Sequence, residues 1–135
     1  MNENTINIAL NYGYSVVRSL VARALTVYGL HPSLGLFHDS RLNAFNLADD
    51  FVEAYRPVVD LQVATRIHEQ DPWTKNLRVY MVNVVNRDVQ FEEDRISVTR
   101  AVEETVKSFV TSVRSKDPGK VKLPSLLPLK THLYE

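Results

Sequence analysis

The 135-residue sequence contains no cysteine, and this absence removes several kinds of chemistry at once. Without thiols the chain can form neither a disulfide framework nor a thiolate zinc site, and it has no cysteine nucleophile. It also lacks an excess of charge of either sign, because 16 Lys and Arg residues balance 16 Asp and Glu residues. Net charge therefore does not indicate nucleic-acid binding, and any affinity for DNA must come from local basic patches.

Long hydrophobic runs are missing as well. No apolar stretch approaches the length of a membrane-spanning helix, and the N-terminal residues MNENTINIAL lack the basic flank and apolar core of a signal peptide. The sequence has no phosphate-binding glycine loop, no GxSxG elbow and no HExxH motif. The apolar fraction of 44% is ordinary for a globular protein. We therefore expect one cytoplasmic domain that does not contact a membrane.

The sequence does contain a series of helical patterns. Apolar residues recur at spacings of three and four from about residue 4 to 28, which predicts an amphipathic helix that stops at Gly29. A second helix is predicted to be capped by Asn46 and to span residues 47–60, continuing towards residue 68. Pro57 lies inside this stretch and is expected to kink the helix or divide it in two.

Three further elements follow along the chain. A β-branched helical stretch is predicted at residues 75–86, and weak alternation around a charged turn predicts a small β-hairpin at residues 88–97. Ser97 or Thr99 then begins an amphipathic helix. Its predicted apolar side consists of Val98, Val102, Val106, Phe109, Val110 and Val113. The sequence thus indicates a mainly α fold, with a helical domain at residues 1–120 and a basic, proline-containing tail at residues 121–135.

Acidic residues gather on one face of the second predicted helix. At about 100° per residue, the side opposite its apolar face carries Asn46, Asp49, Asp50, Glu53 and Arg56. Carboxylates so close together repel unless a cation lies between them, and Mg²⁺ or Mn²⁺ prefers carboxylate oxygen with an occasional imidazole. His38 precedes this face by a short loop. The spacing allows a metal site, but it also allows the more common case, a solvated face whose first acids serve the helix N-terminus.

Three motifs give the sequence a resemblance to a known family. The segments NIALNYGYSVVRS, GLHPSLGLFH and NLADDFVEAYRPVVD occur in this order. They resemble the CRISPR spacer-acquisition integrases, the Cas-one endonuclease family, and within it the members from single-effector (type II) systems. The agreement is close at residues 4–60 and looser beyond them. One departure is Ala54-Tyr55-Arg56-Pro57, where the family more often has Pro-Phe-Arg-Pro.

The resemblance implies roles for individual residues. The family binds Mg²⁺ or Mn²⁺ with a Glu, a His and a later Asp or Glu. His38 matches the His and Glu53 the later carboxylate, which makes both catalytic, and Asp50 is an alternative or supporting ligand. The residues expected to line the site or approach DNA are Asn11, Tyr14, Arg18, Arg41 and Arg56. Two alternatives stay open, since Tyr14 could simply be packed and Arg56 could pair with Asp49 or Glu53.

The resemblance also implies a function and partners. The family is a metal-dependent DNA endonuclease and integrase, in which a DNA 3′-hydroxyl attacks the border of a CRISPR repeat and joins new spacer DNA to the array. The implied partners are prespacer and repeat DNA, the small Cas-two protein and, in the full-length family, a second copy in a homodimer. The family's first metal ligand and its β-rich N-terminal domain precede the LNYGY segment. We therefore expect a piece of a longer protein, or a split or truncated gene product, with an incomplete metal site and little activity alone.

The basic tail and two other functions complete the expectations. The basic residues of this region could contact DNA or dock onto the Cas-two partner, or they could belong to a solvated, partly disordered terminus. They are Arg114, Lys116, Lys120, Lys122 and Lys130. The chain could also act as a non-catalytic DNA- or partner-binding module. A structural helical domain left by gene decay is the remaining alternative.

Overall fold

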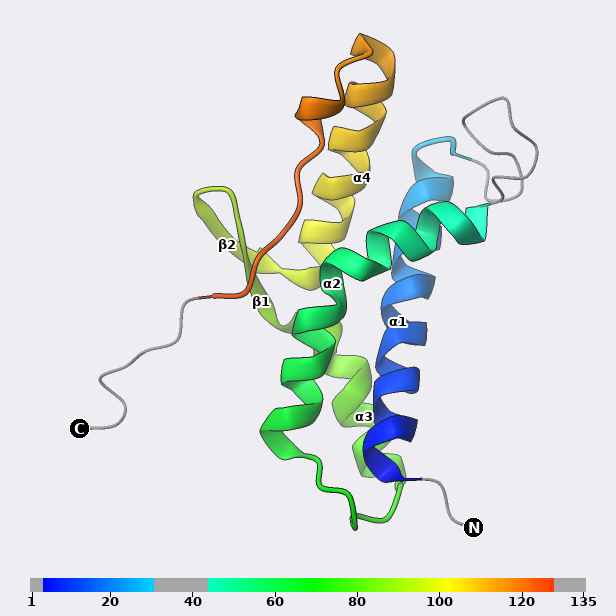
Figure 1. Ribbon diagram of the computed structural model, residues 1–135, viewed down its shortest axis with the longest axis vertical. Helices are drawn as coiled ribbons and strands as arrows, with labels where there is room; N and C mark the ends of the chain where they lie inside the picture. The colour runs from blue at the N-terminus through cyan, green and yellow to red at the C-terminus, as the bar shows by residue number, and fades with distance from the viewer. Residues whose placement is uncertain (1–3, 31–43, 128–135) are drawn as a thin grey trace.

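The fold is mainly helical, with one small hairpin (Figure 1). The structure is a computed structural model that describes residues 4–30 and 44–127, and the side chains of residues 44–48 are not part of the description. The helices and strands, in chain order, are α1 (Thr5–Val27), α2 (Ala44–Arg66), α3 (Lys75–Val82), the 3₁₀ turn η1 (Asn83–Asn86), β1 (Asp88–Phe91), β2 (Asp94–Ser97), α4 (Val98–Ser115) and the 3₁₀ turn η2 (Pro118–Lys120). The predicted fold class is confirmed. Within the described residues, no helix is long and apolar enough to cross a membrane.

α1 begins and ends as the sequence predicts. The Asn4 side chain caps it by accepting a hydrogen bond from the backbone N–H of Ile6 at 2.8 Å. Gly29 follows the helix with a φ of +80°, in the left-handed region that glycine adopts without strain. The buried face of α1 repeats mostly every four residues and consists of Thr5, Ala9, Gly13, Val17, Val21, Ala24 and Leu25. This face packs against α2, α3 and α4.

α2 differs from the prediction at its start and agrees with it at Pro57. The helix begins at Ala44, so Asn46 lies inside the first turn and its predicted capping role is wrong. The polar residue before Leu47 resembled a cap, but the helical backbone extends back through Ala44 and Phe45. Pro57 lies within the continuous helix, and Figure 1 shows α2 changing direction near its middle. Proline causes such a bend because it lacks the N–H donor and its ring clashes with the preceding turn.

The hairpin and the tail form one connected unit. β1 and β2 are antiparallel, with Asp88 opposite Ser97 and Phe91 opposite Asp94. Ser125 bridges the other edge of β1, because Ser125 and Gln90 exchange two backbone hydrogen bonds of 2.9 Å. The predicted hairpin is therefore confirmed. Residues 121–127 are mostly exposed and pass beside β1, and Lys130 lies outside the described residues.

α4 is capped by Ser97, whose side-chain oxygen accepts a hydrogen bond from the N–H of Arg100 at 3.2 Å. Its buried face differs from the predicted apolar side in the last turns. Ser108 and Ser112 are buried there, while Val113 is 37% exposed. The two hydroxyls are satisfied by the chain that follows, since Ser112 donates to the carbonyl of Asp117 and Ser108 accepts from the N–H of Lys122. The returning segment therefore decides which side of α4 is covered.

Tyr55 joins α2 to α4 through a buried hydrogen bond of 2.9 Å between its hydroxyl and that of Thr105. Burial raises the pKa of Tyr55 well above its usual value of 10. The folded state therefore holds the phenol proton more tightly than the unfolded state does. Below pH 10 both states are protonated and the free energy of unfolding is unaffected. Above pH 10 the unfolded state ionises first, so the free energy of unfolding falls as the pH rises. This buried phenol is a source of sensitivity to alkaline pH.

Tyr55→Phe is expected to lower the free energy of unfolding by about 1 kcal/mol at pH 7, because one buried hydrogen bond is lost. Above pH 10 the difference should shrink and reverse, since the wild type loses about 1.4 kcal/mol per pH unit through this phenol and the variant does not. Urea unfolding at pH 7, 10 and 11 measures both effects. Parallel pH profiles for the two proteins would contradict the assignment.

Candidate functional site

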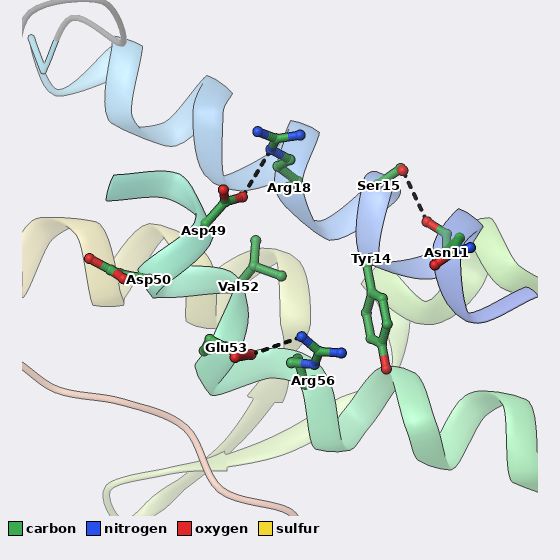
Figure 2. A pocket seen from close by; sticks show the side chains of 9 residues that line it. All are labelled: Asn11, Tyr14, Ser15, Arg18, Asp49, Asp50, Val52, Glu53 and Arg56. Carbon is green, nitrogen blue, oxygen red and sulfur yellow. Dashed lines mark hydrogen bonds and ion pairs between the residues drawn. The ribbon is translucent and has the colours of Figure 1, made fainter. Parts of the chain in front are cut away.

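An open polar pocket lies between α1 and the first half of α2, with a volume of about 650 Å³ (Figure 2). We call it the α1–α2 pocket. It is lined by Asn11, Tyr14, Ser15 and Arg18 from α1 and by Asp49, Asp50, Val52, Glu53 and Arg56 from α2. Six of the eight residues predicted for the site therefore meet in one place, namely Asn11, Tyr14, Arg18, Asp50, Glu53 and Arg56. The other two, His38 and Arg41, lie outside the described residues.

The helical repeat explains why these residues meet. On α1 the pocket residues are Asn11, the adjacent pair Tyr14 and Ser15, and Arg18. Each lies within one turn of the next, on a stripe beside the buried face. On α2 the exposed residues Asp49, Glu53 and Arg56 alternate with Phe51, Tyr55 and Val58, which are buried. The predicted separation of an acidic and an apolar face on α2 is confirmed. Packing α1 against α2 then turns two surface stripes into one pocket.

Two arginines neutralise two of the pocket carboxylates. Arg18 Nε lies 3.1 Å from Asp49 Oδ1 and connects α1 to the start of α2. Arg56 Nη1 lies 3.3 Å from Glu53 Oε2 one turn away on α2, as Figure 2 shows. All four side chains are between 44% and 62% exposed, so each pair contributes at most about 1 kcal/mol to stability. The predicted alternative that Arg56 pairs with Glu53 is confirmed.

The guanidinium of Arg56 lies over the ring of Tyr14. The Tyr14 hydroxyl donates a hydrogen bond of 2.5 Å to Asp60 Oδ1, and the Arg56 guanidinium carbon is 4.4 Å from the centre of the Tyr14 ring. Burial and the bond to Asp60 raise the pKa of Tyr14, while Arg56 acts in the opposite direction. Contacts with Tyr14 and then Glu53 raise the pKa of Arg56. Tyr14 is therefore a protonated donor and Arg56 a cation at every ordinary pH.

Asp60 is a residue that the sequence analysis did not select. It follows Arg56 by four residues on the same exposed side of α2 and anchors the phenol of Tyr14. The spacing on the helix could have indicated it, since residues four apart are neighbours. The link to Tyr14 depends on how α1 and α2 pack, which periodicity does not give. Ser15, also unselected, lines the pocket, and its hydroxyl donates to the carbonyl of Asn11.

The pocket supplies part of a ligand set for a divalent ion. Carboxylate oxygens with an amide oxygen from Asn11 have the chemistry that Mg²⁺ and Mn²⁺ prefer. Among the residues that the structure describes, however, no three His, Asp or Glu side chains lie close enough to hold a metal ion. Figure 2 shows that the Asp50 carboxylate extends away from those of Asp49 and Glu53. The donor set thus fits such an ion in kind, with further ligands needed from elsewhere.

Comparison with known proteins identifies the sequence family of the chain. The family described as CRISPR associated protein Cas1 matches residues 1–81. The CRISPR-associated endonuclease Cas1 of Neisseria meningitidis is 42% identical over 138 residues, which cover 99% of this chain and 45% of that protein. The Hyperthermus butylicus endonuclease Cas1 is 37% identical over 70 residues, or 51% of this chain and 21% of that protein. A Pyrobaculum aerophilum endonuclease Cas1 is 38% identical over 68 residues, which cover 50% of this chain and 22% of that protein.

With a family match over more than half of its residues, and a relative that aligns along nearly all of it, the chain belongs to the Cas1 family. The resemblance found in the three sequence motifs is therefore confirmed. The chain spans less than half the length of the relatives that it matches. The roles of His38, Asp50 and Glu53 in metal binding, and of the arginines in DNA binding, remain predictions.

Proposed function

We propose that this chain forms the C-terminal, largely helical part of a metal-dependent DNA endonuclease and integrase that inserts spacer DNA into CRISPR arrays. The observation that carries the proposal is the α1–α2 pocket, where six of the residues implied by the family motifs converge from two helices. Membership of the Cas1 family adds support, because the relatives are named CRISPR-associated endonucleases.

In the proposed reaction, the 3′-hydroxyl of spacer DNA attacks the phosphorus of a phosphodiester at the border of a CRISPR repeat. A new P–O bond forms to the spacer, the P–O3′ bond of the attacked strand breaks, and its 3′-oxygen leaves and takes up a proton. His38, which lies outside the described residues, and Glu53 would hold Mg²⁺ or Mn²⁺, with Asp50 as an alternative or supporting ligand, and further ligands would be needed. The bound ion supplies polarisation of the phosphodiester and stabilises charge on its oxygens. Arg18 and Arg56, about half exposed in the pocket, contact DNA phosphates together with Arg41. Asn11 and Tyr14 line the site and keep these groups in place.

The proposed partners follow from the family. They are prespacer and repeat DNA, the small Cas-two protein and a second copy of the complete protein, in the prokaryotic cytoplasm. The segment at residues 121–127 is a candidate contact surface because it is held in place on the hairpin. Lys122 pairs there with Glu92 at 3.2 Å, which leaves Lys120 at the exposed edge of η2 as the more available cation for a phosphate.

A chimera tests the proposal in a complete protein. This chain would replace the aligned segment of the Neisseria meningitidis relative, and joining of a labelled DNA 3′-end to a repeat-containing plasmid would be measured with Mn²⁺ and with EDTA. We expect joining by the chimera with Mn²⁺ only, and little or no cleavage of branched DNA by the isolated chain. An inactive chimera beside an active relative would contradict the proposal. Robust cleavage by the isolated chain, lost on His38→Ala, would contradict the incomplete site.

A non-catalytic DNA-binding module is the second candidate. The observation in its favour is that Asp49 and Glu53 already pair with arginines, so two of the three pocket carboxylates are neutralised without a metal ion. Binding of DNA by the isolated chain that persists in EDTA and in Glu53→Ala would favour this candidate. A salt dependence of binding that disappears on deletion of residues 121–135 would assign the contact to the tail.

A further inference from the structure

We propose that Arg56 is an internal counter-cation for Glu53, held in place by Tyr14 and Asp60, and that a divalent ion must displace it from Glu53 in order to bind. The inference rests on the proposed function, since it concerns the same pocket. It gives Arg56, which the family motifs suggested for DNA binding, a second role as a competitor of the metal ion for Glu53. Arg56 and Tyr14 are thereby positioning residues for Glu53.

The contacts of Arg56 carry the inference. Its guanidinium is bound on one side by the Glu53 carboxylate at 3.3 Å and lies on the other side over the Tyr14 ring at 4.4 Å. A planar guanidinium suits both contacts at once, because it can stack on an aromatic face while its N–H groups point at a carboxylate. The ring itself is fixed, since the Tyr14 hydroxyl donates to Asp60 Oδ1 at 2.5 Å across the two helices. The position of the Arg56 side chain is therefore more restricted than that of a typical exposed arginine.

Charge explains the competition. Glu53 is the pocket carboxylate directed towards Arg56, whereas Asp50 extends away from it (Figure 2). A divalent ion that uses Glu53 as a ligand meets a positive charge only a few ångströms away and an oxygen already engaged in an ion pair. Removing that charge should tighten metal binding. Weakening the contact that holds Arg56 in place should have a smaller effect in the same direction.

Paramagnetic broadening by Mn²⁺ in the ¹⁵N-labelled chain measures this competition, because it detects weak binding. The readout is the Mn²⁺ concentration that halves the Glu53 amide signal. In Arg56→Gln we expect this concentration to fall by up to about thirtyfold, the size expected for a doubly charged ion and one unit charge at about 4 Å in an exposed site. Arg56→Lys keeps the charge but not the planar stacking group, so its Mn²⁺ concentration should lie between those of the wild type and Arg56→Gln. Tyr14→Phe, which removes the hydroxyl that bonds to Asp60 and contacts Arg56 but keeps the ring, should also give an intermediate value.

Arg66→Gln is the matched control. Arg66 is an exposed arginine of the same helix whose guanidinium lies 5.0 Å from the ring of Tyr80, outside the α1–α2 pocket. The variant loses an arginine and a ring contact, and it should leave the Mn²⁺ response unchanged. A second readout without metal is the solvent exchange of the Arg56 Nε–H, which should speed up in Tyr14→Phe.

The outcomes separate this inference from the proposed function. Broadening at Glu53 that is abolished in Glu53→Ala but identical in wild type and Arg56→Gln would overturn the counter-cation role alone. An equal fall in the Mn²⁺ concentration that halves the Glu53 signal in Arg56→Gln and Arg66→Gln would also overturn the counter-cation role, since it would show a general charge effect. Absence of local broadening in every variant would overturn it together with the proposed metal site.

Discussion

Glu53→Ala is expected to abolish detectable Mn²⁺ binding by the chain and to lower DNA strand transfer by the chimera at least about 100-fold. Loss of a group that only supports a metal ligand typically costs 10–100-fold in affinity or activity, and Glu53 is proposed to contact the ion itself. Its carboxylate is exposed and lies in the pocket beside Arg56, so its removal takes nothing from the buried core. The rate of joining at saturating Mn²⁺ measures the effect.

Glu103→Ala serves as the control for this prediction. Glu103 is an exposed acid of α4 outside the α1–α2 pocket, and its removal changes the net charge by the same amount. It should leave the rate of joining within about twofold, since surface substitutions away from a site are usually nearly neutral. Equal losses in the two variants would mean that overall charge, and not the position of Glu53, determines activity.

Gly13→Ala is expected to destabilise the fold by about 1–2 kcal/mol, although alanine is the better helix former. A Cβ at this position would lie 2.7 Å from Val59 Cγ1 on α2 and 2.7 Å from Met81 Cε on α3. Met81 can move the end of its flexible side chain, but Val59 is β-branched and fully buried, so α1 must shift. Overpacking of about 1–3 kcal/mol therefore outweighs a helix-propensity gain of about 0.5–1 kcal/mol.

Thermal and urea unfolding measure this effect, and two further variants test its cause. Ser19→Ala places the same side chain on the exposed side of α1 and should be neutral or slightly stabilising. Val59→Ala removes the Cγ1 atom that the new Cβ would meet. Gly13→Ala should therefore cost less in the Val59→Ala background than in the wild type. Additive costs in the double variant would show that the close approach of α1 and α2 does not cause the loss.

The elements of the fold were largely predictable, because local signals determine them. Asn4 and Gly29 bound α1, Pro57 bends α2, and the alternation around residues 88–97 gives the hairpin. Two features depend on tertiary structure instead. Ser108 is buried because the chain returns over α4, and residues 121–127 lie beside β1 because Ser125 pairs with Gln90. Contacts between residues distant in sequence leave no periodic signal in either segment.

The candidate site was predictable in its members and not in its contacts. Helical spacing placed Glu53 and Arg56 one turn apart, and their ion pair is the one that such spacing favours. The family motifs added Tyr14 and Arg18 on α1. The bond from Tyr14 to Asp60 and the pair between Arg18 and Asp49 depend on the angle and depth at which α1 meets α2, which no single helix pattern contains.

We propose that the α1–α2 pocket is part of a divalent-metal site with Glu53 as a ligand. A calorimetric titration of the purified chain with Mn²⁺, beside Glu53→Ala and Glu103→Ala, tests it most directly. The account predicts weak binding by the wild type and by Glu103→Ala, and none by Glu53→Ala. Binding of equal strength in all three proteins, or no binding by the wild type, would contradict it.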